Sequence, residues 1–149
     1  MLLKHVSSVP EEPVASGSGT TRQVLIGPTE GPNFAMRRFI MQPGGGIPRH
    51  TNTVEHEQYV LRGRARVGIG EEVVQVREGD VLFIPRGHVH HFANHGTEDA
   101  RELSVITPGL LGPEYFREIA AVVNVAGPPN VERIMEVMRR HGLRPAPAG

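Results

Sequence analysis

Three histidines and one asparagine have spacings that could bring their side chains to one point. His50, Asn52 and His56 lie in one extended-looking stretch, and His90 lies in a second. Side chains on one face of a strand recur at every second residue, so the first three share a face if the stretch is regular. Neutral imidazoles are the commonest protein ligands of divalent first-row metals. The spacing predicts one metal ion held by His50, His56 and His90, with Asn52 as auxiliary ligand or water anchor.

The same alternation places two further side chains beside this point. Gln58 continues the face of His56, and Phe92 continues the face of His90. We therefore expect Gln58 and Phe92 to line a substrate pocket next to the metal. The remaining histidines are expected to be solvated or hydrogen-bonded, and Asn94 to stabilise a turn.

Arg37 and Arg38 are adjacent, so only one of them can face the interior of a regular strand. An inward arginine would favour an anionic substrate such as a carboxylate or enolate. The expectation is that both side chains reach solvent.

The elements that must position these residues are short strands. From Thr21 onward, β-branched and aromatic segments alternate with Gly, Pro, Asn or charged turns every eight to twelve residues or so, as in an all-β sandwich or barrel. Gly70-Glu71 predicts a tight hairpin, and Glu78-Gly79-Asp80 predicts a turn. This gives an N-terminal strand or arm over 1–20 and a β-barrel over 21–107.

Beyond Pro108 the apolar period changes from two to about 3.6, which predicts two amphipathic helices in a C-terminal extension over 108–149. Pro113 suits the first turn of one helix. Asn130 suits the N-cap of the other, and Gly142 its end. We expect the apolar helix faces to pack against the barrel or a second subunit.

Composition excludes several classes of function. Sixteen basic residues balance sixteen acidic ones, so no basic field would attract nucleic acid or a membrane surface. No apolar run is long enough to span a bilayer, and no signal peptide is evident, so a cytoplasmic location is expected. Cysteine is absent, so any metal must be bound by nitrogen or oxygen.

Both histidine stretches resemble the conserved motifs of the cupins. The first is similar to G-x5-H-x-H-x3,4-E-x6-G and the second to G-x5-P-x-G-x2-H-x3-N, the latter at every fixed position. The matching residues are Gly44, His50, Asn52, His56 and Gly63 in the first motif, and Gly79, Pro85, Gly87, His90 and Asn94 in the second.

This resemblance implies a double-stranded β-helix, the jelly-roll barrel of the cupins, followed by two short C-terminal α-helices. His56 replaces the family's usual glutamate ligand, as in small manganese-binding cupins whose WEHE-like segment is similar to the VEHE of this chain. Asn52 replaces the second histidine, which leaves a three-histidine site like that of cupin dioxygenases using ferrous iron. The implied cofactor is one divalent ion: Mn, Fe, Ni or Zn.

Two functions remain open from the sequence. One is a metal-dependent, dioxygenase-like enzyme acting on a small organic molecule through an enolate, phenolate or carboxylate oxygen. The other is a non-enzymatic sensor or binding protein for a small molecule, because one fold hosts many functions. A barrel that serves only as a scaffold ranks last. A homodimer is expected in each case, since exposed strand edges and apolar helices gain from being covered.

Overall fold

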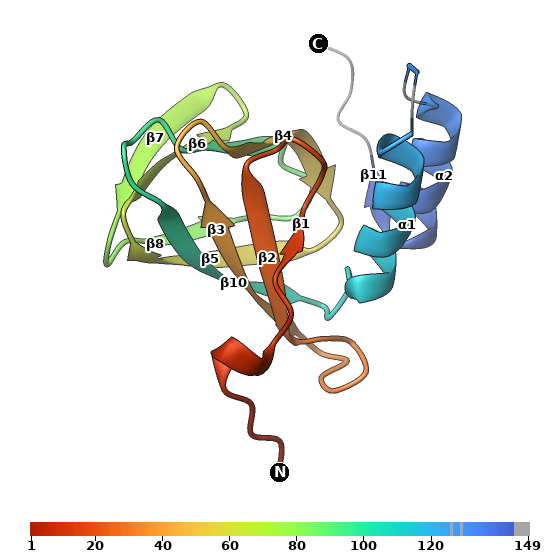
Figure 1. Cartoon of the computed structure of the whole chain (residues 1–149), viewed down its shortest axis with the longest axis horizontal. Coiled ribbons are helices and arrows are strands. Elements are labelled where there is room, and N and C mark those ends of the chain that lie inside the picture. The colour runs from red at the N-terminus through yellow and green to blue at the C-terminus, as the bar shows by residue number, and fades with distance from the viewer. Residues whose placement is uncertain (126, 129, 145–149) are drawn as a thin grey trace.

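The computed structural model describes residues 1–125, 127–128 and 130–144, and it consists mainly of two antiparallel sheets that enclose a common interior (Figure 1). In the first sheet the strand order is β1 (Glu12–Pro13), β2 (Thr20–Ile26), β3 (Ala35–Met41), β10 (Ala100–Thr107), β5 (Glu55–Arg62) and β8 (Val81–Ile84). In the second it is β11 (Leu143–Arg144), β4 (Gly46–Asn52), β9 (His90–Ala93), β6 (Arg64–Ile69) and β7 (Glu72–Arg77). The expected all-β jelly roll with two C-terminal helices is confirmed.

Alternation along the strands decides which side chains face the interior. On β10, Ala100, Glu102, Ser104 and Ile106 are buried and the residues between them are half-buried. One apolar cluster between the sheets includes Met41, Val60, Val67, Ile84 and Phe92. A second cluster, near the helices, is formed by Ala35, Val54, Ile106, Leu111, Phe116 and Leu143.

The predicted turns form where glycine permits them. Gly70 joins β6 to β7 with a φ of 60°, and Gly79 lies in the turn before β8 with a φ of 90°. Both angles fall in the left-handed region, which glycine adopts without steric cost.

Two helices, α1 (Pro113–Val123) and α2 (Val131–Arg140), pack beside one end of the sheets (Figure 1). Pro113 opens α1, and the side chain of Asn130 accepts a hydrogen bond of 3.0 Å from the backbone N–H of Arg133 at the start of α2. Gly142, with a φ of 75°, follows the end of α2. The predicted helix boundaries are thus confirmed at these positions. No described helix has the length and apolarity to cross a membrane.

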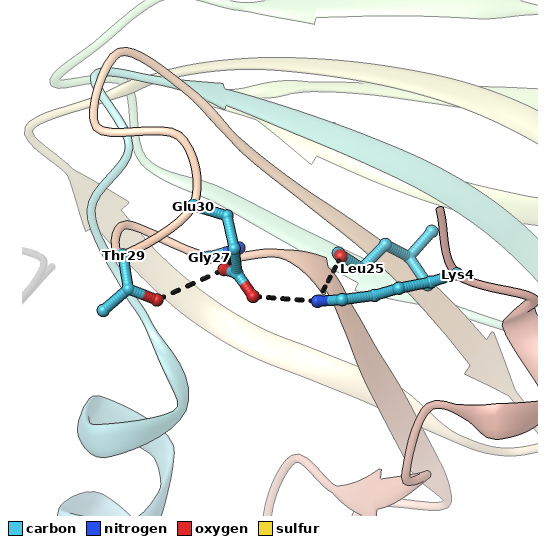
Figure 2. A network of polar contacts seen from close by, with 5 residues as sticks. All are labelled: Lys4, Leu25, Gly27, Thr29 and Glu30. Carbon is cyan, nitrogen blue, oxygen red and sulfur yellow. Dashed lines mark hydrogen bonds and ion pairs between the residues drawn. The ribbon is translucent and has the colours of Figure 1, made fainter. Parts of the chain in front are cut away.

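The N-terminal arm contains a 3-10 turn, η1 (Val6–Ser8), and strand β1, which pairs with β2. Figure 2 shows how the arm is attached to the end of β2. The Lys4 ammonium donates to Glu30 at 2.8 Å and to the Leu25 carbonyl at 3.2 Å. Glu30 also accepts from the Gly27 N–H and the Thr29 hydroxyl, and the Lys4 contact is the largest cause of a lowered pKa at Glu30.

Candidate functional site

The two sheets bring three imidazoles together. His50 on β4 and His90 on β9 are directly paired across the second sheet, and their ring centroids lie 4.2 Å apart. His56 comes from β5 in the first sheet, and its ring lies 5.3 Å from that of His90. The sequence spacing therefore did predict side chains that meet in space.

The stretch that carries His50, Asn52 and His56 is not one regular strand, contrary to the simple reading of its spacing. The chain turns at Thr53 and Val54, so His50 and His56 belong to different sheets. The pairing of β4 with β9 is also irregular between Ile47 and His50. Alternation holds along β5, where His56, Gln58 and Val60 are buried.

Asn52 lies among the imidazoles. Its side-chain amide nitrogen is 3.1 Å from Nε2 of His56 and 3.4 Å from Nε2 of His90. Its Oδ1 is buried and has no hydrogen-bond partner among the described residues. Nitrogen and oxygen of an amide exchange places by one rotation, so Asn52 can present either a donor or an acceptor to the cluster.

Backbone carbonyls fix the tautomers of two rings. Nδ1 of His50 lies 2.8 Å from the Pro48 carbonyl, and Nδ1 of His90 lies 2.8 Å from the His88 carbonyl. A carbonyl oxygen only accepts, so each Nδ1 carries the hydrogen and each Nε2 keeps its lone pair. This arrangement is typical of histidines that ligate a metal.

Burial keeps all three rings neutral at pH 7. Desolvation is the largest cause of a lowered pKa at His50, to about 4, and nearby His90 adds to it. Burial likewise lowers the pKa of His56 well below 6.5, with Arg37 as the next cause, and it lowers the pKa of His90. Neutral imidazole is the form that binds metal.

These donors fit a divalent ion by their chemistry: three neutral imidazoles, two with a fixed tautomer, and an amide with an unpartnered buried oxygen. The side chains do not stand in a finished coordination sphere, because the described residues contain no group of three His, Cys, Asp or Glu placed to hold an ion. Binding would require side-chain rotation, first of all by Asn52, whose amide nitrogen contacts two of the Nε2 atoms.

A cavity of about 440 Å³ opens from His50, Asn52 and His56 towards the helices. Gln58 and Phe92, the side chains expected beside the metal, are in its wall. Most of the rest is apolar: Phe39 and Ile47 from the sheets, and Phe116, Ile119 and Met138 from α1 and α2. Its size falls in the range of pockets for drug-sized molecules.

Residues 37–106 match the model of the cupin domain, and this segment contains the whole imidazole cluster. The chain belongs to the cupin family. The matched segment lies within the predicted barrel, and the helices that cover the cavity lie outside it.

The relatives of this cupin include proteins of polyketide biosynthesis. It is 28% identical over 117 residues to the tetracenomycin polyketide synthase protein TcmJ of Streptomyces glaucescens, covering 76% of this chain and 78% of that one. It is 33% identical over 99 residues to the polyketide synthase CurC of Streptomyces cyaneus, covering 65% and 64%. The polyketide cyclase RemF of Streptomyces resistomycificus has a similar structure, with a TM-score of 0.62 and 29% identity over 78% of this chain and 93% of that one.

The expectation for the paired arginines was wrong for Arg37. Arg37 is 2% exposed and lines the cavity, whereas Arg38 is only half-buried and donates to the Gln23 side chain at 3.0 Å. Residues 35–41 are apolar on both faces of β3, so composition could not show which arginine points inward. Only the pairing with β10 makes this clear: Arg37 lies opposite Ser104, which is buried.

Asn94 has the structural role expected of it. Its side chain donates to the carbonyls of Met41 and Glu98, at 2.8 and 2.7 Å, and accepts from the Gly96 N–H. The sequence did not predict that α1 and β11 take part in the site. Tyr115 and Leu143 line the cavity, and Leu143 is paired with Asn52 across β11 and β4.

Proposed function

We propose that this cupin is an enzyme that binds one divalent metal through His50, His56 and His90 and acts on a largely apolar, oxygen-bearing small molecule of polyketide type. The observation that carries the proposal is the convergence of three neutral imidazoles, two of which, His50 and His56, line a largely apolar cavity. A bound divalent ion would stabilise negative charge on an enolate or phenolate oxygen and, if it is iron, manganese or nickel, would supply dioxygenase-like redox chemistry.

The protein's own residues have distinct tasks in this proposal. The carbonyls of Pro48 and His88 hold His50 and His90 in the ligating tautomer. Gln58 offers an amide beside the cluster, and Phe92 and Phe116 supply flat apolar walls against a ring system. The likeness to RemF and TcmJ supports a polycyclic or polyketone substrate.

Metal analysis tests the proposal directly. Plasma mass spectrometry on untagged wild type should find close to one equivalent of metal, or should do so after reconstitution with Mn, Fe, Ni or Zn. The variants His50→Ala and His90→Ala should lose it. His95→Ala is the matched control, because His95 is exposed. A wild type that takes up none of the four ions, or variants that retain the metal, would overturn the proposal.

A second candidate is a binding or sensor protein without turnover. It is favoured by the cavity wall, in which the described lining residues include no aspartate or glutamate to act as general base. Oxygen uptake and product formation with flavonols, diketones and aromatic diols separate the two. Turnover that disappears in His56→Ala supports the enzyme, and tight binding without turnover supports the sensor.

A further inference from the structure

Arg37 is a buried cation with no ion-pair partner among the described residues. Its side chain is 2% exposed, and Nε and Nη2 have no hydrogen-bond partner among the described residues. The neighbouring buried Arg22, by contrast, has a counter-ion: its guanidinium contacts the Glu12 carboxylate at 3.0 Å and the Pro13 carbonyl at 2.8 Å, and only its Nε has no partner among the described residues. A buried charge that lacks both a counter-ion and hydrogen bonds is costly, so its presence calls for an explanation.

The side chain of Arg37 is part of the wall of the cavity at the proposed active site. Its Cζ is 5.6 Å from the ring centroid of Phe116 and 5.8 Å from that of Phe39. Its charge also contributes to the lowered pKa of His56 and His50, which places it within electrostatic range of the imidazoles. Arg37 is therefore a buried cationic position in this largely apolar cavity, whose wall also contains the Gln58 amide and the exposed Arg49.

The part of the chain that the structure describes supplies no buried counter-ion for Arg37. The buried acid facing the interior of the first sheet is Glu102, which lies opposite Phe39. No ion pair joins it to Arg37 among the described residues. Burial alone raises the pKa of Glu102 to about 7, with no cation acting to lower it. Glu102 is also absent from the described cavity wall.

We infer that Arg37 binds a carboxylate of the ligand, so that this cupin takes aromatic or polycyclic organic acids. The inference rests on the proposed function, since it adds a second contact for the same ligand in the same cavity. Guanidinium pairs with carboxylate through two parallel hydrogen bonds, and both unpartnered nitrogens of Arg37 are donors. One guanidinium matches the single charge of a carboxylate better than the nearly double charge of a phosphate.

Calorimetric titration with 2-naphthoate and its neutral analogue 2-naphthamide tests this inference. Wild type should bind the carboxylate at least about tenfold more tightly than the amide, and Arg37→Met should lose that preference while binding the amide as before. Arg37→Lys, which keeps the charge without the planar fork, should be intermediate. Arg38→Met, next in the sequence and half-buried, is the matched control and should behave as wild type.

Thermal unfolding distinguishes a binding role from a structural one. If Arg37 serves the ligand, ligand-free Arg37→Met should be at least as stable as wild type, and 2-naphthoate should no longer raise its Tm. A lower Tm in the ligand-free variant, together with an unchanged preference for the carboxylate, would overturn the inference. Equal binding of 2-naphthoate and 2-naphthamide by wild type would also overturn it.

The same titrations separate this inference from the proposed function. A carboxylate preference that depends on Arg37 in a protein that binds no metal supports the inference and contradicts the metal enzyme. A preference that is lost in His56→Ala but kept in Arg37→Met means that the carboxylate binds at the imidazoles. That result would overturn the role of Arg37 and leave the metal site intact.

Discussion

Glu102 shows how a single buried residue can make stability depend on pH. It is 1% exposed, and its Oε1 has no hydrogen-bond partner among the described residues. Burial raises the pKa of this carboxyl from 4.5 to about 7, so it stays protonated in the folded protein where the unfolded chain is already ionised. Between these pH values the folded protein binds one proton more than the unfolded chain. The free energy of unfolding therefore falls as pH rises from about 4.5 to about 7.

We expect Glu102→Gln to remove this pH dependence. At pH 8 the variant should be more stable than wild type by about 3 kcal/mol, because glutamine carries no charge to bury, and at pH 4 the two should be alike. Urea unfolding at pH 4, 5.5 and 8 measures the difference. Glu98→Gln, at an exposed position, should track wild type at all three values. A constant difference between Glu102→Gln and wild type across the range would contradict the pKa assigned to this carboxyl.

At the scale of single residues, the sequence predicted which side chains meet, but it did not predict which charged side chains are buried or protonated. The motif spacing brought His50, His56 and His90 together with Asn52, and it placed Gln58 and Phe92 in the cavity wall. It could not show that Arg37 is buried or that Glu102 is protonated. Both properties depend on the pairing of β3 with β10, which joins segments far apart in the chain.

Helix α1 forms one wall of the cavity through Phe116. Phe116 is 7% exposed and belongs to the second apolar cluster. The Arg22 guanidinium lies 3.5 Å from the centroid of its ring, a cation–π contact, and Tyr115 packs against it with the ring centroids 4.9 Å apart. Through this one aromatic side chain, the helix packs against β2, lines the cavity and belongs to the same apolar cluster as Leu143 on β11.

Phe116→Ala should lower the free energy of unfolding by about 3 kcal/mol, because it removes a buried ring and leaves a void beside the existing cavity. Chemical denaturation measures this loss. The control is Val131→Ala on α2, where the side chain is exposed and little change is expected. Similar losses in both variants would show that α1 does not depend on Phe116 for its packing.

The sequence predicted elements well where the local signal is strong. Pro113, Asn130 and Gly142 marked helix boundaries that the structure confirms, since caps and breakers act within a few residues. It missed the short strand β11, which spans two residues and is defined only by its partner β4. Pairing of this kind leaves no periodic pattern to detect.

At the scale of the whole molecule, the outer face of β5 and β8 carries several exposed apolar side chains, with Glu57 opposite Phe83. Val81 and Phe83 on β8 are 71% and 51% exposed, and Tyr59 and Leu61 on β5 are exposed beside them. Strand β8 is also the edge of the first sheet. An apolar patch next to an open edge favours association, and we propose that a second copy of this chain covers it.

Phe83→Glu should convert the expected homodimer into a monomer, because it places a charge in the centre of the patch. Sedimentation velocity on wild type and variant measures the change. Val73→Glu on β7 is a suitable control: that valine is equally accessible but belongs to the other sheet. A wild type that sediments as a monomer at micromolar concentration would refute the dimer, and dissociation caused by Val73→Glu alone would move the interface to β7.

The pairing of β11 with β4 completes the site with a segment that comes much later in the chain than the histidines. Thr53 hydrogen-bonds to the Gly142 carbonyl, 89 residues later in the chain. Ribosomes release a chain from its N-terminus, so the imidazole cluster emerges before α1, α2 and β11 are available to cover the cavity. We therefore expect the imidazole cluster to be open to an ion or ligand in a chain whose α1, α2 and β11 have not yet docked.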